Sequence, residues 1–459
     1  MRMPFLFAVH NYFTCASNTV NTLPHLRDYF CTVKKQKTMR KLIYTIAMLG
    51  FFTGGAMAQE IETKKDSLTL LKERVETVEG QTSKFSKLKF SAYLQAQAEF
   101  SQKDGKTKVG KNTGFNPQTD DEAFARYGIR RGRLKFEYAG KNAKSVFQLD
   151  LTEKGIGLKD AYFQVDEPFL KMFSMKVGVF DRPFGDEISY SSSLRESPER
   201  TWLFQNLFPD ERDLGAMMIV KAPKQSALEG LKLQAGLFSG NGIRQDDNSK
   251  LDFIGHLKYD KAAGEFEWGL GASLYCGTTN NADSVLYEVQ NKTWVASEVE
   301  PNSTNMRTYY GLDAQFSLST AWGLTNVRAE YLFGTQPSVA NSFSSPKANT
   351  YDPAKPFNHK RNFMGFYVYL VQDIYRLPVS AVFKYSYADA NTDLSKDEIS
   401  NAADLSQSSL GLGLLWRCTS NIRLMAYYDI NSNEKTNQIA KYSKDVADNL
   451  FTLRLQYKF

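Results

Sequence analysis

The 459-residue chain is poor in the residues that build disulfide frameworks and membrane-spanning helices. Of its four cysteines, Cys15 and Cys31 lie near the N-terminus, and only Cys276 and Cys418 lie in the body of the chain. Two distant cysteines do not form a disulfide framework. Beyond residue 58, no apolar run approaches the roughly 20 residues that a membrane-spanning helix needs, which argues against a helical membrane protein.

Histidine is also scarce, which bears on enzyme chemistry. Beyond the N-terminal region there are only His256, on a predicted strand, and His359, in a predicted loop. Hydrolases usually need a histidine base beside serine or aspartate, and neither residue has such a sequence context. The chain also has no phosphate-binding glycine motif and no metal-ligand spacing. We therefore expect no enzyme activity and no cofactor.

The positive charge is concentrated at the N-terminus. The whole chain has a net charge of +7, but residues 1–58 hold seven of its 57 basic residues and one of its 50 acidic ones. The remainder has 50 basic against 49 acidic residues. This balance gives no general argument for nucleic-acid binding, and we expect no nucleic-acid partner.

Residues 39–58 are typical of a secretory signal peptide. Arg40 and Lys41 precede an apolar stretch, and Ala56-Met57-Ala58 matches a cleavage site. A retained anchor helix is the alternative. We expect residues 1–38 to be a mis-assigned extension, because they resemble neither a signal nor a domain.

Residues 59–86 contain a short apolar seam. Leu68, Leu71, Val75 and Val78 recur at alternating spacings of three and four, as in a coiled coil. A helix this short is marginal alone. The seam therefore predicts either a periplasmic helix that oligomerises as a coiled coil or an amphipathic helix that packs on its own domain.

Residues 87–459 have a two-residue period, which is typical of strands. Apolar and polar residues alternate from Leu88 to Phe100, and the same pattern ends the chain at Phe459. The segments are close to the roughly 9–11 residues that a tilted membrane-spanning strand needs. Sixteen such segments can be recognised, at 88–100, 129–138, 144–151, 159–166, 173–181, 213–221, 230–238, 251–259, 265–275, 308–318, 324–333, 363–373, 377–387, 408–417, 421–430 and 451–459.

The connections between these segments alternate in length. Long ones, such as 182–212 and 276–307, alternate with tight turns, and only 152–158 is short where a long loop is expected. Trp268, Trp416, Tyr457 and Phe459 lie near strand ends, where bilayer interfaces favour aromatic rings. We predict an all-β fold, a transmembrane antiparallel β-barrel of about 16 strands in the outer membrane. The rival interpretation is a secreted or soluble β protein.

One part of the chain also has a specific family resemblance. In order and spacing, residues 124–220 resemble the phosphate-selective porin O and P family, and the helix before the first strand resembles the periplasmic coiled coil of some relatives. The resemblance implies a trimeric sixteen-stranded barrel whose arginine- and lysine-lined pore passes anions. The segments that carry it are Arg130–Phe136, Phe147–Asp150, Lys159–Tyr162, Lys176–Gly185, Glu199-Arg200 and Glu211–Gly215.

Basic residues on one predicted strand are the first candidates for a pore lining. Arg131, Arg133 and Lys135 share the face opposite Leu134 and Phe136. The apolar face must meet lipid, so the three cations should point into the lumen. Arginine suits an anion pore because its guanidinium stays charged and can bind phosphate with two hydrogen bonds. The alternative is that these residues pair with carboxylates and brace the wall.

The long connection 182–212 supplies the second set of candidates, which are Arg182, Arg195, Arg200 and Arg212. In position and length it resembles the porin loop that folds into the lumen and narrows it. Acidic neighbours such as Glu199 and Glu211 weaken the case for anion selection. A solvated surface loop with paired charges is the alternative.

These features together predict an outer-membrane porin, a water-filled channel for passive diffusion of small hydrophilic solutes, with a modest preference for anions such as phosphate. We expect small anionic or polar solutes and outer-membrane lipid as partners, and a homotrimer. The alternatives are a non-selective or cation-tolerant general porin, or an adhesin or receptor that uses its long loops.

Overall fold

The computed structural model describes residues 70–77, 86–110, 123–243, 246, 248–345 and 357–459. The predicted extension and signal peptide, at 1–38 and 39–58, lie outside the described residues. The chain divides into two units, Met1–Gly80 and Gln81–Phe459. No described helix is long and apolar enough to cross a membrane.

In the first unit, residues 70–77 form a helix, as the apolar seam predicted. Leu71 and Val75 of the seam are exposed on it, as is Leu70. Leu68 and Val78 lie outside the described residues. The partner of this seam therefore stays a prediction.

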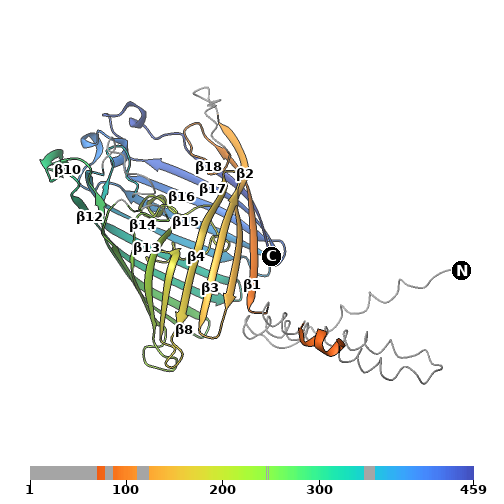
Figure 1. The fold of residues 1–459 in the computed structure, drawn as a ribbon. Helices are drawn as coiled ribbons and strands as arrows, with labels where there is room; N and C mark the ends of the chain where they lie inside the picture. The colour runs from red at the N-terminus through yellow and green to blue at the C-terminus, as the bar shows by residue number, and fades with distance from the viewer. Residues whose placement is uncertain (1–69, 78–85, 111–122, 244–245, 247, 346–356) are drawn as a thin grey trace, which may run out of the picture. The chain divides into compact units, whose positions relative to one another are not determined.

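The second unit is an antiparallel barrel of sixteen strands, and each overlaps one of the sixteen predicted segments. The strands follow one another around the wall in chain order (Figure 1). They are β1 (Leu88–Ser101), β2 (Phe124–Ala139), β3 (Ala143–Thr152), β4 (Gly155–Asp166), β5 (Phe173–Asp181), β6 (Arg212–Lys221), β7 (Leu231–Phe238), β8 (Asp252–Ala263), β9 (Phe266–Asn280), β12 (Thr304–Thr320), β13 (Gly323–Ser338), β14 (His359–Asp373), β15 (Val379–Asp389), β16 (Gln407–Arg417), β17 (Ile422–Asn433) and β18 (Leu450–Lys458).

The wall closes because its two terminal strands pair. β1 pairs with β18 in a register that places Ala96 opposite Leu455. The strands β9 and β12, which flank the 281–303 connection, also pair directly with each other. A closed sheet leaves no edge whose backbone groups would meet lipid, which is the condition for a spanning β-structure.

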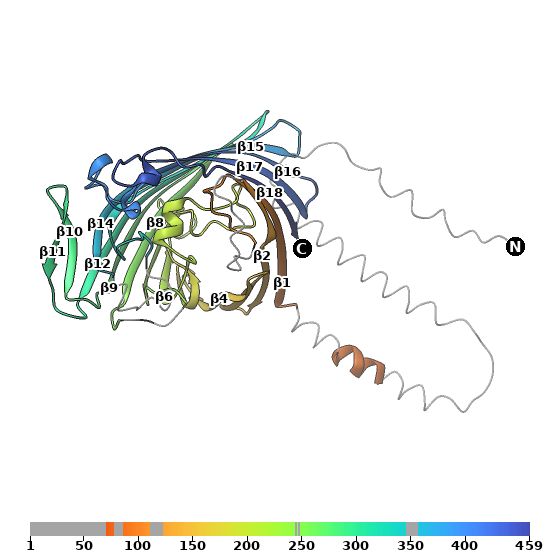
Figure 2. The same ribbon diagram turned by 90° about the horizontal axis from the view of Figure 1, so that it is seen from above.

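A hairpin within the 281–303 connection was not predicted. It consists of β10 (Val285–Gln290) and β11 (Thr293–Glu298) and lies beyond the barrel wall (Figure 2). Its two-residue turn has Asn291 and Lys292 at φ values of 48° and 66°, the left-handed conformation that tight hairpin turns require. Val289 and Trp294 pack against a small core of the 390–406 loop, which fixes the hairpin to its neighbour.

The outer face of the barrel is apolar. Exposed leucines and aromatic residues alternate with inward polar residues on every long strand, for example Leu312 and Phe316 on β12. Trp416, Tyr457 and Phe459 are exposed near the strand ends that carry the short turns, and Trp322 and Tyr375 occupy two of those turns. This band matches a lipid-facing wall with an aromatic girdle.

Candidate functional site

The segment 182–211 folds into the barrel and crosses its lumen. Figure 2 shows its helix α3 (Trp202–Leu207) inside the ring of strands. Ser192 lies against β1, where its hydroxyl is 2.6 Å from the hydroxyl of Tyr93 and its carbonyl accepts a hydrogen bond from Gln95. Further along, Arg328 of β13 pairs with Glu196. The segment therefore narrows the lumen, as its position in the chain predicted.

An aromatic core holds one side of this segment against the wall. Phe208 lies 5.0 Å from Phe184 of the same segment, and 6.0 and 5.8 Å from Tyr275 and Tyr309 of the wall, between ring centroids. All four rings are buried. The sequence signal was available, because 202–208 is unusually apolar for a solvated loop. The alternative of a solvated surface loop is therefore wrong.

Inward charges on that side of the barrel are buried by the segment. The side chains of Arg328 on β13, Lys384 on β15 and Arg454 on β18 are at most 8% exposed. On the β2–β5 side, by contrast, Lys135 keeps 35% and Asp181 31% of its side-chain surface exposed. The inner wall along β2–β5 is therefore partly open to water beside the inserted segment.

The charged side chains along this part of the lumen are nearly balanced. Seven basic and six acidic residues form ion pairs there, and each basic residue has at least one acidic partner. The basic residues are Arg130, Arg131, Arg133, Lys135, Lys159, Lys176 and Arg212, and the acidic ones are Glu137, Asp150, Asp160, Asp181, Glu199 and Glu211.

The three cations predicted on β2 lie on the inner face of the barrel. Arg131 is 3% exposed and donates a hydrogen bond of 3.0 Å to Glu199 of the inserted segment. Arg133 pairs with Asp150 at 3.0 Å, and Lys135 with Glu137 at 2.9 Å. Such pairing was the alternative interpretation of the sequence, in which these basic residues pair with carboxylates and brace the wall.

The four arginines predicted in the long connection occupy different environments. Arg182 is buried and pairs with Asp213 at 2.9 Å, and Arg200 is buried and pairs with Glu211. Arg212 pairs with Asp160 of β4 at 2.9 Å and keeps 16% of its side-chain surface exposed. Arg195 is 2% exposed, and none of its three guanidinium nitrogens has a hydrogen-bond partner among the described residues.

Two β-bulges bring further cations to the lumen. The β1–β2 register shifts where Gln95 faces Arg131 and Ala96 faces Ile129, so Arg130 is the extra residue and turns inward beside Arg131. The β3–β4 register shifts in the same way around Lys159, whose ammonium group pairs with Glu211. Bulges re-aim side chains in this manner.

The bulge on β2 leaves a trace in the sequence. The outward apolar residues are odd-numbered at Tyr127 and Ile129 and even-numbered at Leu134 and Phe136. One parity change in a strand means one inserted residue. Arg130 was not among the predicted pore residues, and this change of parity could have identified it.

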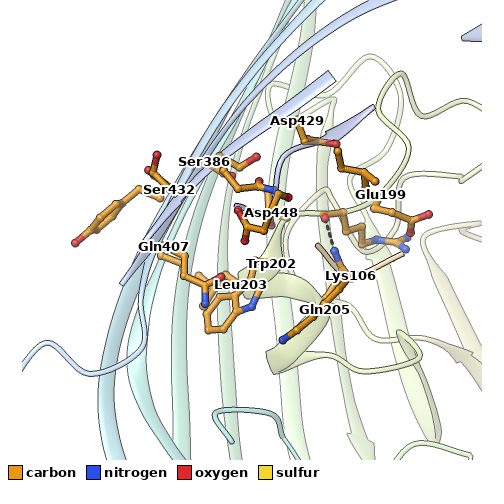
Figure 3. A pocket seen from close by; sticks show the side chains of 18 of the residues that line it. Lys106, Glu199, Trp202, Leu203, Gln205, Ser386, Gln407, Asp429, Ser432 and Asp448 are labelled. Atoms are coloured by element: carbon orange, nitrogen blue, oxygen red, sulfur yellow. Dashed lines mark hydrogen bonds between the residues drawn. The ribbon is translucent and has the colours of Figure 1, made fainter. Parts of the chain in front are cut away.

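A cavity of about 260 Å³ lies between the inserted segment and the loops above it. Figure 3 shows that Glu199, Trp202 and Gln205 of the segment line it together with Ser386, Gln407 and Asp429 of the wall. Burial raises the pKa of the loop residue Glu199, but the attraction of Arg130 and Arg131 is stronger and holds its pKa well below the usual range. Glu199 is therefore ionised at neutral pH.

The histidine sites do not form a hydrolase centre. His256 contacts Asp313 at 2.9 Å, and Ser273 is its register neighbour on β9. The Ser273 hydroxyl instead accepts a hydrogen bond from the Gly185 amide, and all of these groups are buried under the inserted segment. His359 begins β14 rather than lying in a loop. Among the described residues no group of acidic, histidine or cysteine side chains could hold a metal ion.

Comparison with known proteins extends these observations. No protein-family model and no curated protein matches the chain. The outer membrane channel DcaP of Acinetobacter baumannii matches with a TM-score of 0.50 and 12% identity, over 81% of this chain and 97% of that chain. OmpF of Salmonella typhi, in complex with daunomycin, has a TM-score of 0.48 and 11% identity over 81% and 97% of the two chains. Pseudomonas putida OprB has 0.43 and 9% over 89% and 100%.

At these identities the similarity concerns the fold. The sixteen-stranded closed wall, the apolar exterior and the inserted segment define an outer-membrane β-barrel with the porin architecture. The predicted fold class and the predicted location in the outer membrane are confirmed.

Proposed function

We propose that the protein is a porin, a water-filled channel through which small hydrophilic solutes diffuse passively. The observation that carries the proposal is the charged inner wall along β2–β5, where Lys135, Asp150 and Asp181 stay partly exposed beside the inserted segment. An apolar exterior with a charged interior suits a pore in lipid and has no use in a soluble β protein.

A modest preference for anions belongs to the same proposal. The lining has seven cations against six carboxylates, so the excess of positive charge is small. We propose that this preference acts through Lys135 and Arg212, whose side chains keep 35% and 16% of their surface exposed, and through Arg133, which is buried but pairs with the 22% exposed Asp150. Paired charges favour weak selection by charge over a phosphate-specific filter.

Single-channel recording of the refolded mature protein in a planar bilayer, under a KCl gradient, tests both parts. We expect stepwise conductance in groups of three and a reversal potential on the anion side. A zero or cation-side reversal potential would retain the channel and remove the anion preference. Absence of conductance would contradict the channel and favour an adhesin or receptor, for which the interlocked β10–β11 hairpin and 390–406 loop would be the binding surface.

A further inference from the structure

Three arginines converge on a single carboxylate in the lumen. Arg130 donates two hydrogen bonds to Glu199, from Nε to Oε1 at 2.6 Å and from Nη2 to Oε2 at 2.7 Å. Arg131 donates to Oε2 at 3.0 Å, and Arg454 of β18 donates to Oε1 at 3.2 Å. The carboxylate thus receives four charge-assisted hydrogen bonds from two neighbouring regions of the wall.

The surroundings of this carboxylate are strongly positive. A bidentate guanidinium pair is the geometry by which proteins recognise free carboxylates and phosphates. Arg195, whose guanidinium is buried and without a hydrogen-bond partner among the described residues, lies close enough to act electrostatically on Arg131 and Arg454. Nη1 of Arg454 is likewise buried without a partner. One carboxylate therefore faces more positive charge than it neutralises.

The inserted segment does not depend on this carboxylate for its position. Gln456 and Arg423 donate to the backbone carbonyls of Ser193 and Arg195 at 3.1 and 3.0 Å. Arg454 donates to the carbonyl of Pro198 at 2.8 Å, and the Phe208 cluster seats the far side. Because these contacts use backbone oxygens and aromatic rings, they persist when the charge of Glu199 is removed.

We propose that Glu199 is the residue that determines the charge selectivity of this pore, because its carboxylate acts as a tethered ligand in a place that a free carboxylate or other oxyanion would otherwise occupy. The proposal rests on the channel function proposed above. A tethered group acts at a high effective concentration, so dissolved anions at millimolar levels compete poorly with it. The arginines are thereby largely hidden from anions that pass through the wild-type pore.

The first test replaces the charge and keeps the shape. Glu199→Gln should shift the reversal potential in a KCl gradient towards the anion side, with about a twofold or larger rise in the anion-to-cation permeability ratio. Glu229→Gln removes one negative charge from the 222–230 turn, outside the lumen, and should match the wild type. If the reversal potential of Glu199→Gln equals that of the wild type, with or without a larger conductance, the proposal is overturned. Replacing a residue that only anchors the segment would widen the pore without changing its selectivity.

The second test supplies a free carboxylate from solution at the position that the Glu199 carboxylate occupies in the wild type. In Glu199→Ala, sodium acetate should bring the reversal potential back towards the wild-type value in a saturable manner, and it should leave the wild type and Glu229→Ala unchanged. Equal effects of acetate on all three proteins overturn the proposal. If Glu199→Ala does not refold, the glutamine variant still decides. A wild-type protein without conductance would overturn the channel function itself, whereas a conducting wild type with an unshifted Glu199→Gln would overturn only the role of Glu199.

Discussion

An arginine on a barrel strand meets either lipid or water, and one inserted residue decides which. Without the bulge, either Arg130 would share the outward face of Gly132 and Leu134, or Arg131 would share the outward face of Ile129. An arginine at the bilayer midplane facing lipid costs about 2–4 kcal/mol. With the bulge, both arginines reach Glu199. The local irregularity of the strand therefore creates the charged centre of the lumen.

Arg133 offers a direct test of the lining at the scale of one residue. Arg133→Gln leaves Asp150, which is 22% exposed, without its basic partner. We expect about a twofold fall in the anion-to-cation permeability ratio, because one positive charge is lost beside an exposed carboxylate. The measurement is the reversal potential in a KCl gradient. Arg417→Gln, near the turn end of β16, is the control, and an unchanged ratio for Arg133→Gln would show that the residue only braces the wall.

At the scale of elements, the inserted segment behaves as a small hydrophobic core inside a membrane protein. Its sequence predicted a position in the lumen, but not which wall it would cover. That choice depends on Tyr275, Tyr309 and Tyr367, which come from three strands and are brought together only by barrel closure. Pairwise partners of Arg182 and Arg200 were unpredictable for the same reason, because Asp213 and Glu211 are among several nearby carboxylates in the sequence.

Phe208 is the centre of that core and a test of its role. Phe208→Ala should cost about 3 kcal/mol or more, as large-to-small changes of buried aromatic residues do. Since Phe208 contacts Phe184, Tyr275 and Tyr309, its loss should loosen the segment and raise both conductance and open-channel noise. Phe253→Ala, on the lipid-facing side of β8, is the matched control. A Phe208 variant with wild-type conductance and wild-type denaturant midpoint would contradict the seating role.

The 434–449 loop should respond to pH through Asp448. Burial, and then the charges of Asp445 and Asp104, raise the pKa of Asp448 from 3.8 to about 6. A raised acid pKa stabilises the packed loop when the group is protonated, so this contribution is complete below the ordinary value and is lost as pH rises through about 6.

Hydrogen exchange of peptides from this loop measures that change. After correction for intrinsic rates, protection should be greater at pH 5 than at pH 7.5. Asp448→Asn should show the high protection at both pH values. The Lys441–Asp104 ion pair, at 2.9 Å, should persist across this range because each partner favours the charged form of the other. Equal protection of the wild type at the two pH values would contradict the assignment.

At the scale of the whole molecule, the period of two predicted the number and order of the barrel strands, because lipid on one side and water on the other force strict alternation. The β10–β11 hairpin could not be predicted from this period. Its strands, Val285–Gln290 and Thr293–Glu298, are short and pack on another loop rather than on lipid. The start of β4 at Gly155 also differed from the prediction at 159, because the bulge at Lys159 interrupts the alternation there.

Trimer formation is the prediction for the assembled protein. The helix at 70–77 exposes Leu71 and Val75 on one seam, and a short apolar seam needs a partner. Leu71→Asp combined with Val75→Asp should reduce the trimer fraction measured by light scattering in detergent, while conductance per barrel stays unchanged. Lys72→Asp with Glu76→Lys, off the seam, is the control. An unchanged trimer fraction would assign the seam to packing on its own chain.

The pairing of β1 with β18 also determines when the protein can fold. Residues 88–101 pair with β2 on one side, but their other edge stays unpaired until residues 450–458, far later in the sequence, are available. Contacts so distant in sequence form slowly, and an open strand edge invites pairing with other chains. The exported polypeptide should therefore need a holding chaperone until its last nine-residue strand emerges. A truncation that removes β18 would leave β1 and β17 with open edges and should therefore promote aggregation.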